Sequence, residues 1–184
     1  GEILKHALIA DKKFFSFLSK NGSKILSLKS PLIEKVIYKS CSIKKRIVEA
    51  DENEMSLRKI LNFGHTFAHA YEATLGYSKK LNHGEAVIMG IKTAAKFSLL
   101  NKILNIKEFK LIENHLNNLN LPRDISKKFS SNNLNKILSF MKKDKKNNSK
   151  KINLVLIKKI GFPIYELEFH EKKIHSFLKK ELIK

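Results

Sequence analysis

Apolar residues at helical spacing constrain the fold of this 184-residue chain more than any other feature. They recur every three or four positions, and each run stops near glycine, proline or asparagine. The pattern predicts helices over residues 3–18, 31–43, 56–75, 83–100, 106–119, 132–141 and 170–182. We expect Asn21-Gly22 to end the first helix and Asn82 to cap the fourth, whose small residues favour tight packing. On the second helix we expect a buried side made of Leu32, Ile33, Val36, Ile37 and Ile43.

One segment departs from the helical pattern. Residues 151–157 (KINLVLI) alternate and are rich in β-branched side chains, which predicts a strand, and residues 162–167 are its expected hairpin partner. The charged run 142–151 before it is expected to be a solvated loop. The fold class is therefore mainly α: a single multi-helix domain over residues 1–184, with a short strand or hairpin near 151–167.

The chain is strongly basic, with a formal net charge of +20. Such a charge attracts nucleic acid or anionic membranes without specificity. The lysines are scattered, arginines are few and no nucleic-acid-binding motif appears, so we expect no specific nucleic-acid partner. A non-catalytic nucleic-acid-binding module remains the alternative of another class. Such a module would bind DNA duplexes of random sequence with an affinity that falls steeply with salt, and it would hold no metal.

Two further features bear on the compartment. Cys41 is the single cysteine, so no internal disulfide can form, which fits a reducing compartment such as the cytoplasm. No apolar run is long enough to span a membrane, and no signal peptide is recognisable. We therefore expect a cytoplasmic protein without a membrane partner.

Three histidines point to metal chemistry. His65 and His69 lie four positions apart, so on a helix they share a face, and His83 begins the next apolar run. Imidazoles from two helices, with a carboxylate nearby, form a common donor set for a divalent metal. The pair lacks the glutamate of a metalloprotease HExxH motif. On spacing alone, ordinary surface or capping histidines remain an alternative.

The motifs around these histidines resemble a known family. The blocks GEILKHALIAD, DENEMSLR, LNFGHTFAHAYE and HGEAVIMG occur in the order found in the C-terminal domain of 3-dehydroquinate synthases. The resemblance implies that Glu2, His65 and His83 hold a divalent metal, zinc or cobalt. It also implies the dehydroquinate synthase-like fold, which metal-dependent alcohol and polyol dehydrogenases share.

The resemblance further implies an enzyme that works with a second domain. Proteins of this family are about twice as long, with an N-terminal NAD-binding domain. This chain has no glycine-rich dinucleotide fingerprint, so NAD would be bound mainly by the missing domain. We expect the chain to be a C-terminal fragment that is inactive alone, and a homodimer is compatible with the resemblance.

The implied activity is a phosphate-eliminating lyase reaction of the shikimate pathway, which leads to chorismate and the aromatic amino acids. In it, 3-deoxy-D-arabino-heptulosonate 7-phosphate becomes 3-dehydroquinate plus phosphate. Transient NAD-dependent oxidation precedes elimination, and reduction and intramolecular aldol closure follow. The implied substrate is a phosphorylated keto-sugar acid, whose two anionic groups call for fixed cations.

The resemblance assigns further residues to this substrate. His69 and Lys5 are expected to be catalytic, with His69 contacting the phosphate or relaying a proton. Expected substrate-binding residues are Lys44, Arg58, Asn62 and Lys146. Because Arg58, Asn62, His65 and His69 recur at helical spacing, we expect them along one helix face, with only Lys5, Lys44 and Arg58 as cations near the cleft.

Glu72 and Glu85 lie near the histidines in sequence. They either hydrogen-bond to the metal ligands and orient them or lie on the surface, and Glu85 is the stronger candidate for orienting a ligand. The chain also departs from the family pattern, with Ala68 in place of a usual glycine, Tyr71 in place of isoleucine, and Met55-Ser56 before Leu57.

Two related enzyme classes remain alternatives. Metal-dependent polyol dehydrogenases typically use aspartate as the first ligand and need no cation set, so Glu2 and Arg58 favour the synthase. Other sugar-phosphate cyclases share the key residues and are harder to separate.

Overall fold

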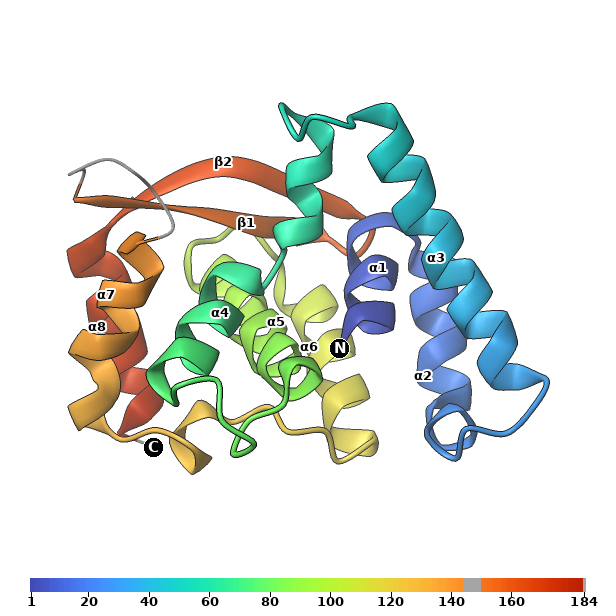
Figure 1. The fold of residues 1–184 in the computed structure, drawn as a ribbon, viewed down its shortest axis with the longest axis horizontal. Helices are drawn as coiled ribbons and strands as arrows, with labels where there is room; N and C mark the ends of the chain where they lie inside the picture. Colours follow the sequence, from blue (N-terminus) through green and yellow to red (C-terminus); the bar gives the residue numbers. More distant parts are fainter. Residues whose placement is uncertain (144–149, 184) are drawn as a thin grey trace.

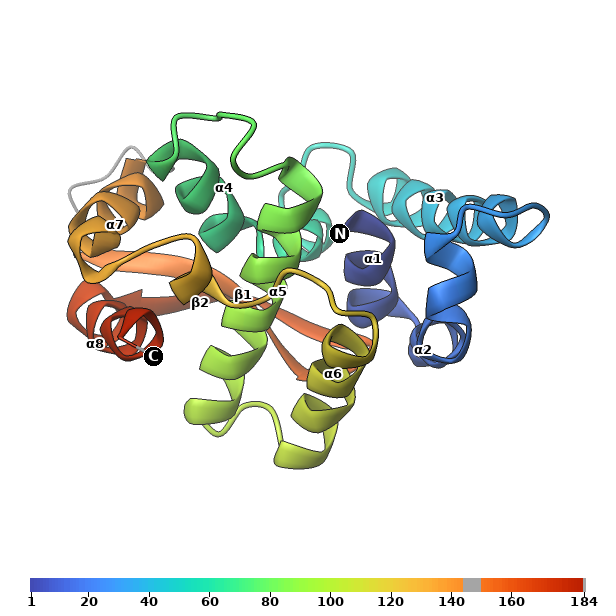
Figure 2. The same cartoon turned by 90° about the horizontal axis from the view of Figure 1, so that it is seen from below.

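The computed structural model describes residues 1–143 and 150–183, and most of them are helical, which confirms the mainly α expectation. Figures 1 and 2 show the helices packed around a central one. The α-helices are α1 (Glu2–Ala10), α2 (Lys12–Leu26), α3 (Leu32–Ala50), α4 (His65–Thr74), α5 (His83–Leu100), α6 (Ile106–Asn118), α7 (Leu134–Lys143) and α8 (Glu171–Leu182). Short 3₁₀ helices occupy Leu57–Asn62 (η1), Ile125–Lys127 (η2) and Ser131–Asn133 (η3).

The predicted hairpin is present. Strands β1 (Lys151–Lys159) and β2 (Phe162–His170) pair antiparallel, with Lys151 opposite His170. The register shifts between Leu154 and Leu156, so the ladder is irregular near its middle. The hairpin lies along one side of the helices, with β1 in contact with α5 (Figure 1). Alternation and β-branching therefore predicted β1, which extends two residues beyond the expected run, and the segment expected as its partner forms β2.

Helix α5 forms the centre of the core. It is buried on almost every side and contacts α4, α6 and β1, as a helix apolar all round should be. Its Gly90 faces the start of α4, where an added Cβ would lie only 2.2 Å from the Gly64 carbonyl oxygen. The expectation of tight packing through small residues on this helix is confirmed.

The expected first helix is two helices. Asp11 adopts an extended backbone and its carboxylate accepts a hydrogen bond from the Phe14 N–H at 2.8 Å, which ends α1 and begins α2. Helix α2 then continues through Asn21-Gly22, so that pair is not a C-terminal cap. Gly22 is buried against Leu119, where any side chain would collide. The capping aspartate and tertiary packing outweigh the local helix-stop signal.

The expected helix over 56–75 is also divided. Residues Leu57–Asn62 form η1, and α4 begins only at His65. Gly64 between them has φ +79°, a left-handed conformation that glycine adopts without strain. On α3, the prediction for Ile37 is wrong, because 48% of its surface is exposed. The other expected ends of α5 to α8 differ from the structure by only a few residues.

None of the helices in the described part of the chain is both long and apolar enough to cross a bilayer. The charged run after α7 lies largely outside the described residues.

Burial of His115 on α6 predicts acid-sensitive stability. The ring is 6% exposed, its Nδ1 lies 3.0 Å from the Ser19 hydroxyl, and burial lowers the pKa of His115 from 6.5 to about 4. The unfolded chain therefore binds more protons between these values, so this contribution is complete above pH 6.5 and is lost as the pH falls toward 4. In denaturant titrations, His115→Phe should remove about 2–3 kcal/mol of the pH dependence. The partly exposed His175→Asn is the control, and an equal effect there would contradict the assignment.

The contact between α4 and α5 predicts that Gly90→Ala is destabilising. The added methyl group must push the Gly64 carbonyl away, and we expect a loss of about 1–3 kcal/mol in the free energy of unfolding. Gly84→Ala is the matched control on the same helix, because an added Cβ there would lie 3.9 Å from its nearest neighbour, the Gly1 nitrogen. Similar stability of the two variants in chemical denaturation would refute the close approach.

Candidate metal centre

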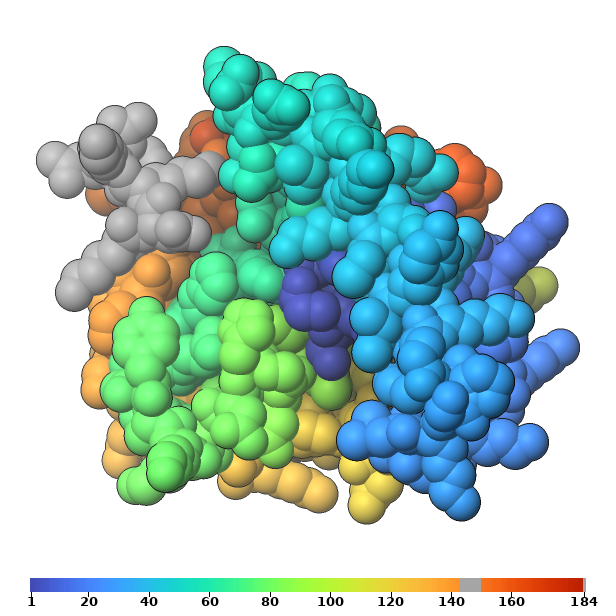
Figure 3. Space-filling view, turned by 45° about the vertical axis from the view of Figure 1, so that its right-hand side comes forward, coloured from blue at the N-terminus to red at the C-terminus, as the bar shows by residue number. Residues whose placement is uncertain are grey.

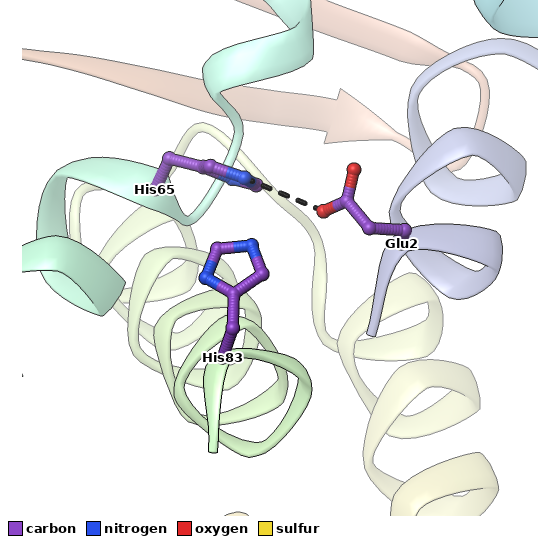
Figure 4. Close-up of side chains that lie close together, drawn as sticks. All are labelled: Glu2, His65 and His83. Carbon is purple, nitrogen blue, oxygen red and sulfur yellow. Dashed lines mark ion pairs between the residues drawn. The ribbon is translucent and has the colours of Figure 1, made fainter. Parts of the chain in front are cut away.

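The starts of three helices meet at one point. Glu2 begins α1, His65 begins α4 and His83 begins α5. One ligand atom from each residue lies within 4.8 Å of the others, and Figure 4 shows the three side chains pointing toward a common space. In the space-filling view the first residues of the chain emerge between α3 on one side and α4 and α5 on the other (Figure 3). The structure thus brings together the three residues that the sequence assigned to one metal.

His65 is oriented by the turn that precedes it. Gly64 redirects the chain so that α4 begins beside Glu2, and the His65 Nδ1 lies 3.4 Å from the Phe63 carbonyl oxygen. Its Nε2 lies 3.3 Å from Oε1 of Glu2. A proton on Nδ1, directed at the carbonyl, leaves the Nε2 lone pair facing the carboxylate side of the site.

His83 is oriented by a carboxylate. Its Nδ1 lies 3.1 and 3.3 Å from the two carboxylate oxygens of Glu72, which is largely buried on α4. A histidine that donates from one ring nitrogen to a carboxylate presents the other nitrogen as a fixed, more basic metal ligand. The sequence favoured Glu85 for this role, but Glu85 accepts the Asn82 N–H at 3.0 Å and caps its own helix. Glu72 lies seven positions, or two helical turns, after His65. This spacing is the signal in the sequence that could have identified Glu72 as a residue near the ligands.

The two oxygens of the Glu2 carboxylate lie in different environments. Oε2 accepts a hydrogen bond from Lys5 Nζ at 2.9 Å. Oε1 is buried and accepts no hydrogen bond from the residues described, although His65 lies close. Burial favours the neutral acid, but the nearby His65 ring, the charge of Lys5 and the hydrogen bond from Lys5 outweigh it and hold the pKa of Glu2 well below its usual range. The site therefore contains an ionised carboxylate with one buried oxygen in need of a partner.

A divalent cation fits this donor set. Bonds from carboxylate oxygen or imidazole nitrogen to zinc are about 2.0–2.2 Å long, so two ligand atoms of one ion lie at most about 4.4 Å apart. The ligand atoms of Glu2, His65 and His83 lie within 4.8 Å of one another. Small side-chain rotations would bring them within bonding distance of one ion. One carboxylate and two imidazoles leave coordination positions open, as in catalytic rather than structural sites.

A cavity of about 500 Å³ adjoins these ligands. His65 and His69 line it, and the His69 ring lies 5.2 Å from that of His65 and 6.3 Å from that of His83. The hairpin forms another wall, where the side-chain oxygen of Asn153 is buried without a hydrogen bond from any described residue. The sequence reasoning missed Asn153, although asparagine within a strand is unfavourable by propensity. His69 thus lies where a ligand in the cavity would meet the metal centre.

The cations of the cavity differ from those expected. Lysines 59, 142 and 151 line it. Each forms an ion pair with a glutamate of β2 or α8: Lys59 with Glu166 at 2.5 Å, Lys142 with Glu171 at 2.6 Å and Lys151 with Glu168 at 3.2 Å. The prediction that only Lys5, Lys44 and Arg58 lie near the cleft is therefore wrong. Scattered lysines carry no signal in the sequence that would separate these three from the rest.

Arg58 and Asn62 lie on η1 rather than on the helix of His65 and His69. The prediction that these four residues share one helix face is therefore wrong. Asn62 lines the cavity and donates to Glu54 at 2.7 Å. The Arg58 guanidinium donates to the Glu52 carbonyl at 2.6 Å, and Arg58 is not among the described lining residues.

The remaining expected cations are placed as follows. Lys5 is 3% exposed beside Glu2, and burial lowers the pKa of Lys5 despite that carboxylate. Lys44 is exposed on α3, and its charge adds to the lowering of the Lys5 pKa. Lys146 lies outside the described residues.

Solved structures define the class of fold. The chain is similar to 2-epi-5-epi-valiolone synthase from Streptomyces hygroscopicus subsp. jinggangensis, with a TM-score of 0.81, 20% identity, and 98% of this chain and 49% of that one covered. It is also similar to a 2-deoxy-scyllo-inosose synthase, with a TM-score of 0.78, 22% identity, and 97% and 49% coverage. The fold is that of the dehydroquinate synthase-like sugar-phosphate cyclases.

Sequence comparison identifies the family within this class. The profile described as "3-dehydroquinate synthase C-terminal" matches residues 1–147. The 3-dehydroquinate synthase of Pelagibacter ubique (strain HTCC1062) is 72% identical over all 184 residues, and that of Endomicrobium trichonymphae is 46% identical over 165 residues, or 88% of the chain. The chain belongs to the 3-dehydroquinate synthase family. It spans about half the length of these relatives: 50% of the Pelagibacter protein and 43% of the Endomicrobium protein.

The contact between His83 and Glu72 predicts a change in metal affinity. Glu72→Gln keeps the size of the side chain but weakens the acceptor for the His83 Nδ1 proton. We expect metal affinity to fall by about 10–100-fold, measured by Co²⁺ titration in competition with a chelator. Glu85→Gln is the matched control, since Glu85 caps α5 without touching a ligand residue in the structure. A larger loss in Glu85→Gln would restore the original expectation.

Proposed function

We propose that this chain is the metal- and substrate-binding half of a 3-dehydroquinate synthase. The reaction converts 3-deoxy-D-arabino-heptulosonate 7-phosphate to 3-dehydroquinate and phosphate, with NAD bound mainly by an N-terminal half. The convergence of Glu2, His65 and His83 is the observation that carries the proposal. It is supported by the 72% identity to a 3-dehydroquinate synthase. We propose a cytoplasmic location because the single cysteine of this chain suits a reducing compartment.

Zinc or cobalt is the proposed ion, held by Glu2, His65 and His83. The solved structure of the valiolone synthase is described with NAD⁺ and Zn²⁺, and that of the inosose synthase with NAD⁺ and Co²⁺. Either ion accepts one oxygen and two nitrogen ligands. When bound, the ion supplies Lewis acidity to the substrate oxygen at the carbon that is oxidised.

The residues of this chain then bind and orient the substrate. Lys5 holds Oε2 of Glu2 and keeps the carboxylate ionised. We propose that His69, exposed in the cavity beside both histidine ligands, contacts the phosphate or relays a proton. Asn62 on the cavity wall has an amide suited to a substrate hydroxyl or carboxylate.

Three cations are proposed as contacts for the anionic groups. Arg58 has the forked geometry that suits a carboxylate or phosphate, and it would exchange its bond to the Glu52 carbonyl for one to the substrate. Lys44 is close enough to Lys5 to influence its pKa and adds positive charge at the edge of the site. Lys146 is assigned to the substrate by the family motif alone.

The division of the active site between two halves follows from the redox step. Hydride transfer requires the nicotinamide to be held against the carbon that reacts, and fixing both partners supplies much of the rate enhancement. This chain has no dinucleotide fingerprint, and its relatives are about twice as long. We therefore propose that the N-terminal half completes the site, and that homodimer formation remains compatible with it.

The decisive test is metal content and turnover in the full-length protein that contains this chain. His65→Ala should lose the bound metal and essentially all phosphate release from the heptulosonate phosphate in the presence of NAD⁺, because it removes one of three ligands. His175→Ala, on α8, is the control. The isolated 184-residue chain should show no turnover. Full activity in His65→Ala would contradict the metal centre, and turnover by the isolated chain would contradict the divided site.

A further inference from the structure

His6 is a buried polar residue that the proposed function does not use. It lies one turn after Glu2 on α1, and only 3% of its surface is exposed. Its Nδ1 lies 2.7 Å from the hydroxyl of Ser40, a residue of α3 that is itself 5% exposed. The pair joins the two helices inside the protein, where an unsatisfied polar group is costly.

The second nitrogen of His6 faces the metal centre. Its Nε2 lies 3.9 Å from Oε2 of Glu2. This nitrogen is buried and has no hydrogen-bond partner among the described residues, and the same is true of Glu2 Oε1. Two unsatisfied atoms thus lie at the Glu2 carboxylate: its own Oε1, and the His6 Nε2 near its other oxygen. A histidine kept only for packing has no reason to direct a polar atom at that carboxylate.

The Ser40 hydroxyl lies where it can donate to Nδ1 and so fix the tautomer of the ring. If Ser40 donates its proton to Nδ1, the remaining proton of the neutral ring is on Nε2, which then donates toward Glu2. At 3.9 Å, contact with Oε2 requires a small movement or one bridging water.

We propose that His6, held by Ser40, is a positioning residue that orients the Glu2 carboxylate for metal binding. Lys5 and His6 both approach Oε2, so Oε1 is left to face the histidine ligands. Outer partners of this kind fix the orientation of a ligand and raise metal affinity. The inference rests on the metal centre of the proposed function and adds a residue that acts through Glu2 without touching the ion.

Two substitutions of His6 separate positioning from packing. Asparagine places a polar atom near the position of Nδ1, whereas glutamine extends an N–H to the position of Nε2. We expect His6→Asn to lower the Co²⁺ affinity of the full-length protein by about 10–100-fold. His6→Gln should stay close to the unchanged protein. Co²⁺ alone is the probe, titrated by its visible absorption against a competing chelator, with thermal unfolding recorded for each variant.

Ser40→Ala tests the same inference with a smaller change, in case a His6 variant fails to fold. It should lower Co²⁺ affinity in the same direction, by about tenfold. Ser42→Ala is the matched control two positions along α3, because that hydroxyl donates a hydrogen bond to the Tyr38 carbonyl of its own helix at 2.8 Å. Unchanged Co²⁺ affinity in Ser40→Ala, or equal losses in His6→Asn and His6→Gln, would overturn the inference. Co²⁺ binding that survives His65→Ala would instead overturn the metal centre itself.

Discussion

The close approach of α4 to α5 governs the geometry of the metal centre. Gly64 turns the chain with a positive φ, and its carbonyl oxygen rests against Gly90, where even a methyl group would come within 2.2 Å. This contact sets the distance between the two helices, and therefore between His65 at the start of one and His83 near the start of the other. The same pair of helices brings Glu72 to the His83 ring. One contact between two backbones thus positions a ligand pair and the carboxylate that orients it.

Electrostatics at Glu2 complement this packing. Taking a carboxylate oxygen out of water is costly unless opposite charge or hydrogen bonds compensate it. Lys5 compensates one oxygen, and the other faces the two histidines without a donor. A cation between the three side chains would satisfy that oxygen and use the lone pairs of the imidazoles. The proposed metal would therefore complete the compensation of a charge that the fold keeps ionised.

The cavity beside the centre shows how charge is organised in so basic a chain. Most of the net charge of +20 carries no positional information in the sequence. Within the cavity, however, three lysines meet glutamates of β2 and α8. Since exposed ion pairs contribute little to stability, these lysines can exchange a glutamate for an anionic ligand at small cost. Sequence reasoning selected Arg58 and Lys44 from the family motif, and only the folded chain shows which other cations face the cavity.

The sequence by itself determined the helical class and the hairpin at 151–167, because periodicity is a local property. Its motifs, through their resemblance to the family, singled out Glu2, His65 and His83 as the donor set. Tertiary structure decided where helices break and which side chains meet. Asp11 and Gly64 divide helices that periodicity reads as continuous, since a cap or a left-handed residue competes with the same apolar pattern. Glu72 rather than Glu85 reaches His83, and His6 reaches both Ser40 and the vicinity of Glu2. Such pairings depend on the crossing of helices distant in sequence, and no local pattern records that crossing.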